Sequence, residues 1–176
     1  MLARMIQDTS RMDALALQAS GNIRLGELEK AGKYYSSIDA SIAYGLILLR
    51  MGELNHTAGE TDSSIQNYNK AIEFFSRSQV NEGIARANLR LGDIYAEKHM
   101  YGTAEDHLEK ASGMTENDET MWEIWYQKGR IFEQTNRRDS AIAAYKEAVE
   151  IIEKIRGRFT IEEYKSKYID NKVKVY

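Results

Sequence analysis

The side chains best suited to chemistry in this sequence are its histidines and arginines. His56, His99 and His107 do not have the spacing of metal ligands and have no carboxylate at a fixed interval. No glycine-rich phosphate loop and no Ser/His/Asp arrangement occurs. The sequence therefore predicts no catalytic residue, no cofactor and no bound metal, and it favours a protein that is not an enzyme. The chemistry that remains is binding, because guanidinium groups make forked hydrogen bonds with carboxylates.

Composition narrows the class further. The chain has 176 residues, 43% of them hydrophobic, which is enough for one folded domain with a sizeable core. It contains no proline to break a helix and no cysteine to form a disulfide, and the lack of cysteine favours a cytoplasmic location. A formal net charge of −3 gives no attraction to nucleic acid. No run reaches the roughly 18 apolar residues that a membrane span needs, so we predict neither a nucleic acid nor a membrane as partner.

A code of small residues recurs along the chain, on what we expect to be pairs of short amphipathic helices. In one stretch Leu91-Gly92-x-x-Tyr95 is followed by Ala104-x-x-x-Leu108-x-x-Ala111. Glycine and alanine at such points let two helices approach closely. The small residues that open the second helices are spaced 33, 40 and 37 residues apart: Ala31, Ser64, Ala104 and Ala141. The glycines of the first helices keep the last two of these spacings: Gly52, Gly92 and Gly129.

This order resembles the tetratricopeptide repeat, in which Trp-x-x-Leu-Gly-x-x-Tyr precedes Ala-x-x-x-Phe. Trp125, Gly129 and Phe132 follow that pattern in the fourth unit. Elsewhere the chain departs from it, with Asn88 in place of tryptophan and Asn55 in place of the aromatic residue. The resemblance implies an all-α fold, a right-handed superhelix of antiparallel helix pairs with about four repeats. It also implies that the first helix of each pair lines a concave face where a partner protein binds.

We interpret residues 1–176 as a single domain. The repeats are expected at about 12–44, 45–78, 85–118 and 122–155. The helix pairs are expected at roughly 10–24 with 27–39, 40–56 with 61–77, 82–98 with 102–113, and 118–134 with 138–156. Thr160-x-x-Glu163 has the form of a capping box, which predicts a separate helix over 160–176 that covers the last repeat. Because the chain stops within an apolar stripe, we also expect it to be part of a longer protein.

The resemblance places a partner-binding groove on the first helices. Counted from each glycine, its residues are Leu46, Leu49, Arg50, Glu53, Arg86, Leu89, Arg90, Asp93, Tyr126 and Arg130. Arg86 and Arg90 match two basic positions with which one branch of the family holds a peptide carboxylate, although the lysine and asparagines that complete this clamp are absent. Alternatively, these arginines pair with carboxylates of the chain itself, namely Glu53, Asp93, Glu97 and Glu123, as surface charges usually do.

The function predicted from these features is a protein-interaction scaffold without catalytic activity. A partner peptide or helix of unknown identity would lie in the groove, with apolar contacts to Leu46, Leu49 and Leu89 and polar contacts to the arginines. Two alternatives remain open. The array could assemble with copies of itself through its end faces, forming a homo-oligomer, or it could be the regulatory segment of a larger enzyme whose catalytic domain lies outside these residues.

Overall fold

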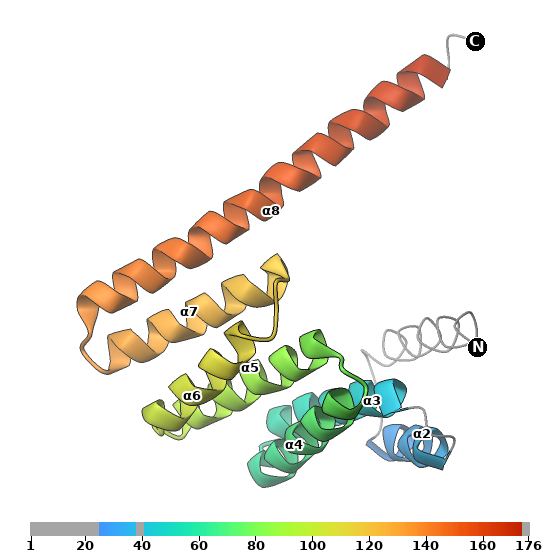
Figure 1. Ribbon diagram of the computed structural model, residues 1–176, viewed down its shortest axis with the longest axis vertical. Coiled ribbons are helices and arrows are strands. Elements are labelled where there is room, and N and C mark those ends of the chain that lie inside the picture. Colours follow the sequence, from blue (N-terminus) through green and yellow to red (C-terminus); the bar gives the residue numbers. More distant parts are fainter. Residues whose placement is uncertain (1–24, 38–40, 174–176) are drawn as a thin grey trace.

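A computed structural model describes residues 25–37 and 41–173 of the chain, and at 25, 26, 29, 35–37 and 159–173 it describes the backbone alone. This part of the chain is entirely helical apart from its turns (Figure 1). The helices are α2 Leu25–Ser37, α3 Ser41–Thr57, α4 Thr61–Arg77, α5 Asn81–Glu97, α6 Tyr101–Ser112, α7 Asp118–Gln134 and α8 Arg138–Val173. The all-α prediction is confirmed, and the helices begin within two residues of the expected positions. The predicted first helix of the first repeat, over 10–24, lies outside the described residues.

The helices stack in chain order as antiparallel pairs. The extensive packing is within the pairs α3–α4, α5–α6 and α7–α8, and each second helix also packs on the first helix that follows it. First helices of neighbouring repeats also touch, α3 with α5 and α5 with α7, whereas no contact joins the second helices α4, α6 and α8 of the described array. An array that is tighter along its first helices curves toward them. We call the surface of α3, α5 and α7 on that side the inner face.

The three repeating glycines occupy equivalent places in the structure. A Cβ atom added to Gly52 would lie 2.6 Å from the Tyr68 ring, and one added to Gly129 would lie 2.5 Å from the Tyr145 ring. At Gly92 the nearest atom would be Cδ2 of Leu108, at 2.9 Å. In each repeat, the large residue that faces the glycine lies four positions after the small residue that opens the second helix. The glycines therefore allow the two helices of a repeat to pack closely, as the sequence pattern predicts.

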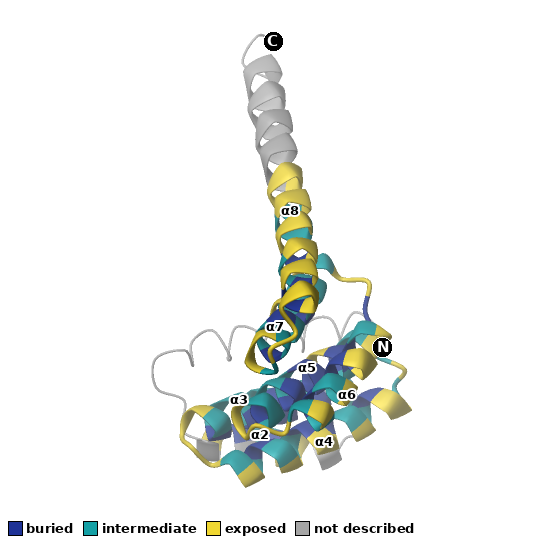
Figure 2. Ribbon diagram, turned by 90° about the vertical axis from the view of Figure 1, so that its left-hand side faces the viewer, coloured by how far each residue is buried: buried dark blue, intermediate teal, exposed yellow. Residues whose placement is uncertain are grey.

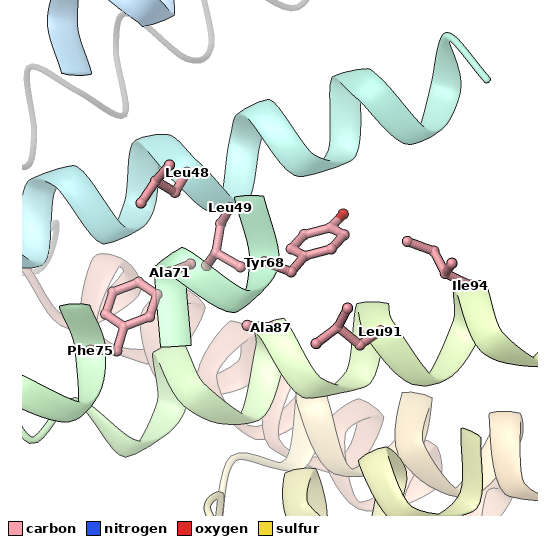
Figure 3. Close-up of a cluster of buried hydrophobic side chains, with 8 residues drawn as sticks. All are labelled: Leu48, Leu49, Tyr68, Ala71, Phe75, Ala87, Leu91 and Ile94. Carbon is pink, nitrogen blue, oxygen red and sulfur yellow. The ribbon is translucent and has the colours of Figure 1, made fainter. Parts of the chain in front are cut away.

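A second use of glycine joins one repeat to the next. Phe75 of α4 is fully buried, and its ring lies 2.7 Å from a Cβ built on Gly45 of α3 and 2.6 Å from one built on Gly83 of α5. Around it, α5 contributes Ala87 and Leu91 to one buried cluster with α3 and α4 (Figure 3). The full cluster consists of Leu48, Leu49, Tyr68, Ala71, Phe75, Ala87, Leu91 and Ile94. Burial of apolar surface between repeats thus holds the stack together.

Tight turns end the helices without proline. Four of the turns between α3 and α8, all except the one between α6 and α7, place one residue in the left-handed region: Gly59 (φ 80°), Gln79 (φ 56°), His99 (φ 57°) and Asn136 (φ 58°). The residue that follows donates its backbone N–H back across the last helical turn, as from Arg137 to the Phe132 carbonyl at 2.8 Å. This closure satisfies a carbonyl that the helix end would otherwise leave without a partner. The turns at 58–60 and 135–137 fall in the gaps between the expected helices 40–56 and 61–77 and between 118–134 and 138–156.

The separate closing helix predicted over 160–176 is wrong for the described residues. The backbone of α8 continues without a break through Thr160 to Val173, while 174–176 lie outside the described part (Figure 1). Gly157 is the one weak helix former near the expected boundary, and a glycine costs a helix only about 1 kcal/mol. Among the described helices α8 packs only against α7, and its outward side is exposed as far as burial is described (Figure 2).

Candidate functional site

The inner face carries most of the residues predicted to bind a partner, and its charges are largely paired with one another. Arg90 of α5 lies 3.0 Å from Glu123 of α7, and Arg130 of α7 lies 3.6 Å from Asp93 of α5. Within α3, Arg50 donates to Glu53 at 2.8 Å. The alternative reading is therefore confirmed for these three arginines, which pair with carboxylates of the chain itself.

A further pair links the second repeat to the third. Nε2 of His56 on α3 lies 2.8 Å from Glu97 on α5. Together with the two pairs between α5 and α7, it forms a line of cross-repeat contacts along the first helices. Pairs of this exposure contribute little stability singly, but they fix which residues of one first helix stand opposite those of the next.

Asp93 is the most perturbed acid on this face. Burial raises the pKa of its carboxyl, and the nearby charge of Glu97 raises it further. Arg130, Arg90 and His56 act in the opposite direction without cancelling the effect. The side chain retains 21% exposure beside Arg130, so Asp93 serves as a half-buried link between repeats rather than as a free acid.

Arg86 differs from the other inner-face arginines. It is exposed, and no ion pair or hydrogen bond involves its side chain in the described part of the chain. One turn along α5, Arg90 is already held by Glu123. Of the two arginines predicted to form a carboxylate clamp, Arg90 is therefore paired within the chain, and Arg86 is available to a partner as far as the described residues are concerned.

Two predicted groove residues, Leu49 and Leu89, are buried within the array, whereas Tyr126 is exposed. Leu49 and Leu89 are only 4% and 2% exposed, because each is covered by the next first helix in a buried cluster. Tyr126 holds the same repeat position and is 45% exposed, with its ring centroid 5.9 Å from that of Tyr145. The spacings of 40 and 37 residues already place these three residues at one position, which is the signal that identifies them as interface residues. The predicted apolar contacts of Leu49 and Leu89 with a partner are therefore wrong, while Leu46 is half-buried.

A small polar pocket of about 80 Å³ opens beside Arg130, between the α5–α6 turn and α7. Tyr101 donates its hydroxyl hydrogen to Gln134 Oε1 at 2.7 Å, and His99 Nδ1 lies 2.8 Å from the same hydroxyl. The lining residues are Ala96, Glu97, His99, Tyr101, Gln127, Arg130, Ile131 and Gln134. No pattern in the sequence indicates this pocket, because its walls come from three helices and a turn.

The histidines have structural surroundings. His107 stacks on Tyr95 with ring centroids 5.3 Å apart, and its Nδ1 lies 2.9 Å from Asn88 Oδ1. Burial, and to a smaller degree the charge of Lys110, lowers the pKa of His107. Across 25–37 and 41–173, no three His, Cys, Asp or Glu side chains cluster as metal ligands would. No helix in those same ranges has the length and apolar character of a membrane span.

Comparison with known proteins agrees with this architecture. Residues 123–155, covering most of α7 and the first half of α8, match the model of the tetratricopeptide repeat. This segment is a tetratricopeptide repeat. The solved structures include one titled "Crystal structure of MamA", with a TM-score of 0.56 and 20% identity over 86% of this chain and 94% of that one. At this identity the likeness concerns the fold alone. No curated protein sequence matches the chain significantly.

Proposed function

We propose that this tetratricopeptide array is a non-catalytic scaffold that binds a partner protein along the inner face of α3, α5 and α7. Tetratricopeptide arrays generally present curved surfaces of this kind to other proteins. We further propose that the chain is one domain with repeats at about 12–44, 45–78, 85–118 and 122–155. A cytoplasmic location and the absence of nucleic acid among its partners remain predictions.

The availability of Arg86 is the observation that carries the proposal. Arg50, Arg90 and Arg130 already have partners within the chain, so a ligand would have to displace Glu53, Glu123 or Asp93 to reach them. Arg86 has no such competitor among the described residues, and its guanidinium can accept a carboxylate with two parallel hydrogen bonds. The scaffold should therefore prefer a partner segment that brings an acidic side chain or a C-terminal carboxylate to Arg86.

A peptide display library tests this preference directly. The intact chain should enrich peptides that carry a carboxylate, and the Arg86→Glu variant should lose them. Arg86→Lys should retain a weaker form of the preference, because an ammonium group keeps the charge but not the forked geometry. Arg77→Glu is the matched control, since Arg77 is an exposed arginine of α4 on the other side of the array, bonded only to Glu73 of its own helix. Equal enrichment by Arg86→Glu and the intact chain would refute the proposal.

A further inference from the structure

The last repeat keeps an apolar seat for a helix that the described chain does not place there. Tyr126 of α7, with Tyr145 and Ala148 of α8, repeats the positions at which each earlier pair receives the next first helix, and Val149 lies beside them at the position of Ile72, which packs against the cluster of the second repeat. We call these four residues the end face. Tyr126 corresponds to Leu49 and Leu89, Tyr145 to Tyr68 and Leu108, and Ala148 to Ala71 and Ala111.

Exposure shows that Tyr126 and Val149 of this seat are uncovered in the described array, although Ala148 is only 3% exposed. In the second and third repeats the first of these positions is almost completely covered, at 4% for Leu49 and 2% for Leu89. In the fourth repeat Tyr126 is 45% exposed, and Val149 beside it is 56% exposed. Large apolar side chains are thus retained at contact positions that have lost their cover, and such exposed apolar surface commonly marks an interaction site.

The covering helix of the third repeat has a recognisable pattern, whereas α5, which covers the second repeat, has Leu91 where α7 has Lys128. On the third repeat, α7 contributes Ile124 and Ile131 to the buried cluster that contains Leu89 and Leu108. Lys128 and Gly129 stand between them, with the Lys128 ammonium 4.8 Å from the centre of the Trp125 ring. The helix that covers the third repeat therefore has the pattern apolar, lysine, small and apolar, at intervals of four, one and two residues.

The end of α8 repeats this pattern in register. Gly92 and Gly129 are 37 residues apart, and counting 37 residues on from α7 gives Ile161, Lys165, Ser166 and Tyr168. Ser166 stands at the glycine position, so a small residue is kept there. This segment follows the last contact of α8 with its own repeat, in which Lys154 and Arg158 bind Asp118 at 2.8 and 2.5 Å. The end of the chain thus carries the sequence of a fifth first helix.

The backbone of α8 takes this segment away from its own end face. The helix is unbroken from Arg138 to Val173, and where it runs past the start of α7 no other described helix lies beside it (Figure 1). A straight helix cannot turn back onto its own first half. A second copy of the chain has no such restriction, because exchange of an identical element between two copies requires no new interface.

We propose that two copies of this chain form a closed dimer in which residues 160–173 of each occupy the end face of the other. The contact continues the α4–α5 and α6–α7 interfaces at the same repeat positions. The dimer leaves the inner face and Arg86 accessible, so this inference does not depend on the proposed peptide binding.

The proposed dimer also predicts that association depends on salt. In the third repeat Glu109 pairs with Lys128 at 3.9 Å, but the fourth repeat has Lys146 at the position of Glu109. In the dimer Lys165, at the position of Lys128, would therefore approach the like charge of Lys146. Added salt screens this repulsion, so association should tighten as the salt concentration rises.

The absence of native cysteine allows a direct test by disulfide trapping. Tyr126→Cys and Ile161→Cys correspond to Leu89 and Ile124, which share a buried cluster. The two single variants, one carrying a size tag, are mixed and mildly oxidised. A disulfide between the tagged and untagged chains is expected, and neither variant alone should give one. If only the double variant Tyr126→Cys/Ile161→Cys forms the bond, and forms it within one chain, the segment closes its own repeat and the exchange is refuted.

Sedimentation equilibrium supplies the second measurement. The intact chain should approach twice its 20.2 kDa mass as concentration rises. Val149→Asp should weaken association at least about tenfold, because an apolar contact is lost at each of two equivalent seats. Ala143→Asp is the control on the same helix. Gln66 of α4 and Asp106 of α6 hold the same repeat position, and both stay exposed although the next repeat packs against their helices. A mass that stays at one copy throughout, or equal weakening by both substitutions with helicity unchanged, would overturn the proposal.

Discussion

Replacing Gly52 by alanine tests the claim that glycine is required for close packing within a repeat. The added methyl carbon would lie 2.6, 2.8 and 2.9 Å from three atoms of the Tyr68 ring, whereas carbon atoms attract one another best at about 3.5–4.0 Å. Tyr68 is 1% exposed, so the ring has no free space into which it can move. Either the ring or the α3–α4 spacing must shift.

Two opposing effects set the size of the change. Overpacking a closed core costs about 1–3 kcal/mol, and alanine gains about 1 kcal/mol over glycine in a helix interior. Three short contacts with an enclosed ring place the packing cost in the upper part of its range, so the net loss should be about 1–2 kcal/mol. For a chain of this size that lowers the melting temperature by about 2–8 °C.

Thermal and urea unfolding followed by circular dichroism measure this loss. Gly102→Ala on α6 is the matched control, because no atom lies within 4 Å of its added Cβ, and it should leave the melting temperature unchanged or raise it slightly. The clash should also depend on Tyr68. In a Tyr68→Leu background, which copies the Gly92–Leu108 pair of the third repeat, the Gly52→Ala cost should shrink. If Gly52→Ala stabilises the chain, or costs the same with leucine at 68, the packing argument is wrong.

Two further predictions concern the charged and titrating groups. Arg90→Glu should lower the unfolding free energy by about 1–2 kcal/mol, because it sets two carboxylates against each other where Arg90 and Glu123 now lie 3.0 Å apart; Arg86→Glu should be nearly neutral, and equal losses in urea titrations would contradict the pairing. His107 has a lowered pKa in the folded state, so the unfolded chain binds more protons and stability should fall as pH drops below about 6.5. Urea midpoints between pH 7.5 and 5 should show a smaller decline for His107→Asn, and an identical decline would remove His107 as its source.

The groove prediction failed in part for a reason that the repeat itself contains. Positions counted from each glycine were all assigned to one exposed face, but a first helix is covered on one side by the next repeat. Leu49 and Leu89 lie on that covered side, while Arg50, Arg86 and Arg90 lie on the open side. A first helix within the stack contacts both its own second helix and the next repeat. The stripe of residues that it exposes on the inner face is therefore narrower than the pattern of a single helix pair suggests.

The sequence by itself determined the helices, their pairing and the places where they approach most closely. These features are local or repeat at fixed intervals, so the positions of Gly52, Gly92 and Gly129 could be read directly. Which arginine has no partner among the described residues was decided only in the tertiary structure, because Glu123 and Asp93 reach Arg90 and Arg130 from another repeat. The course of α8 was decided there as well. A capping box at Thr160 favours a helix start, but it cannot end a helix that has no proline or competing contact to stop it.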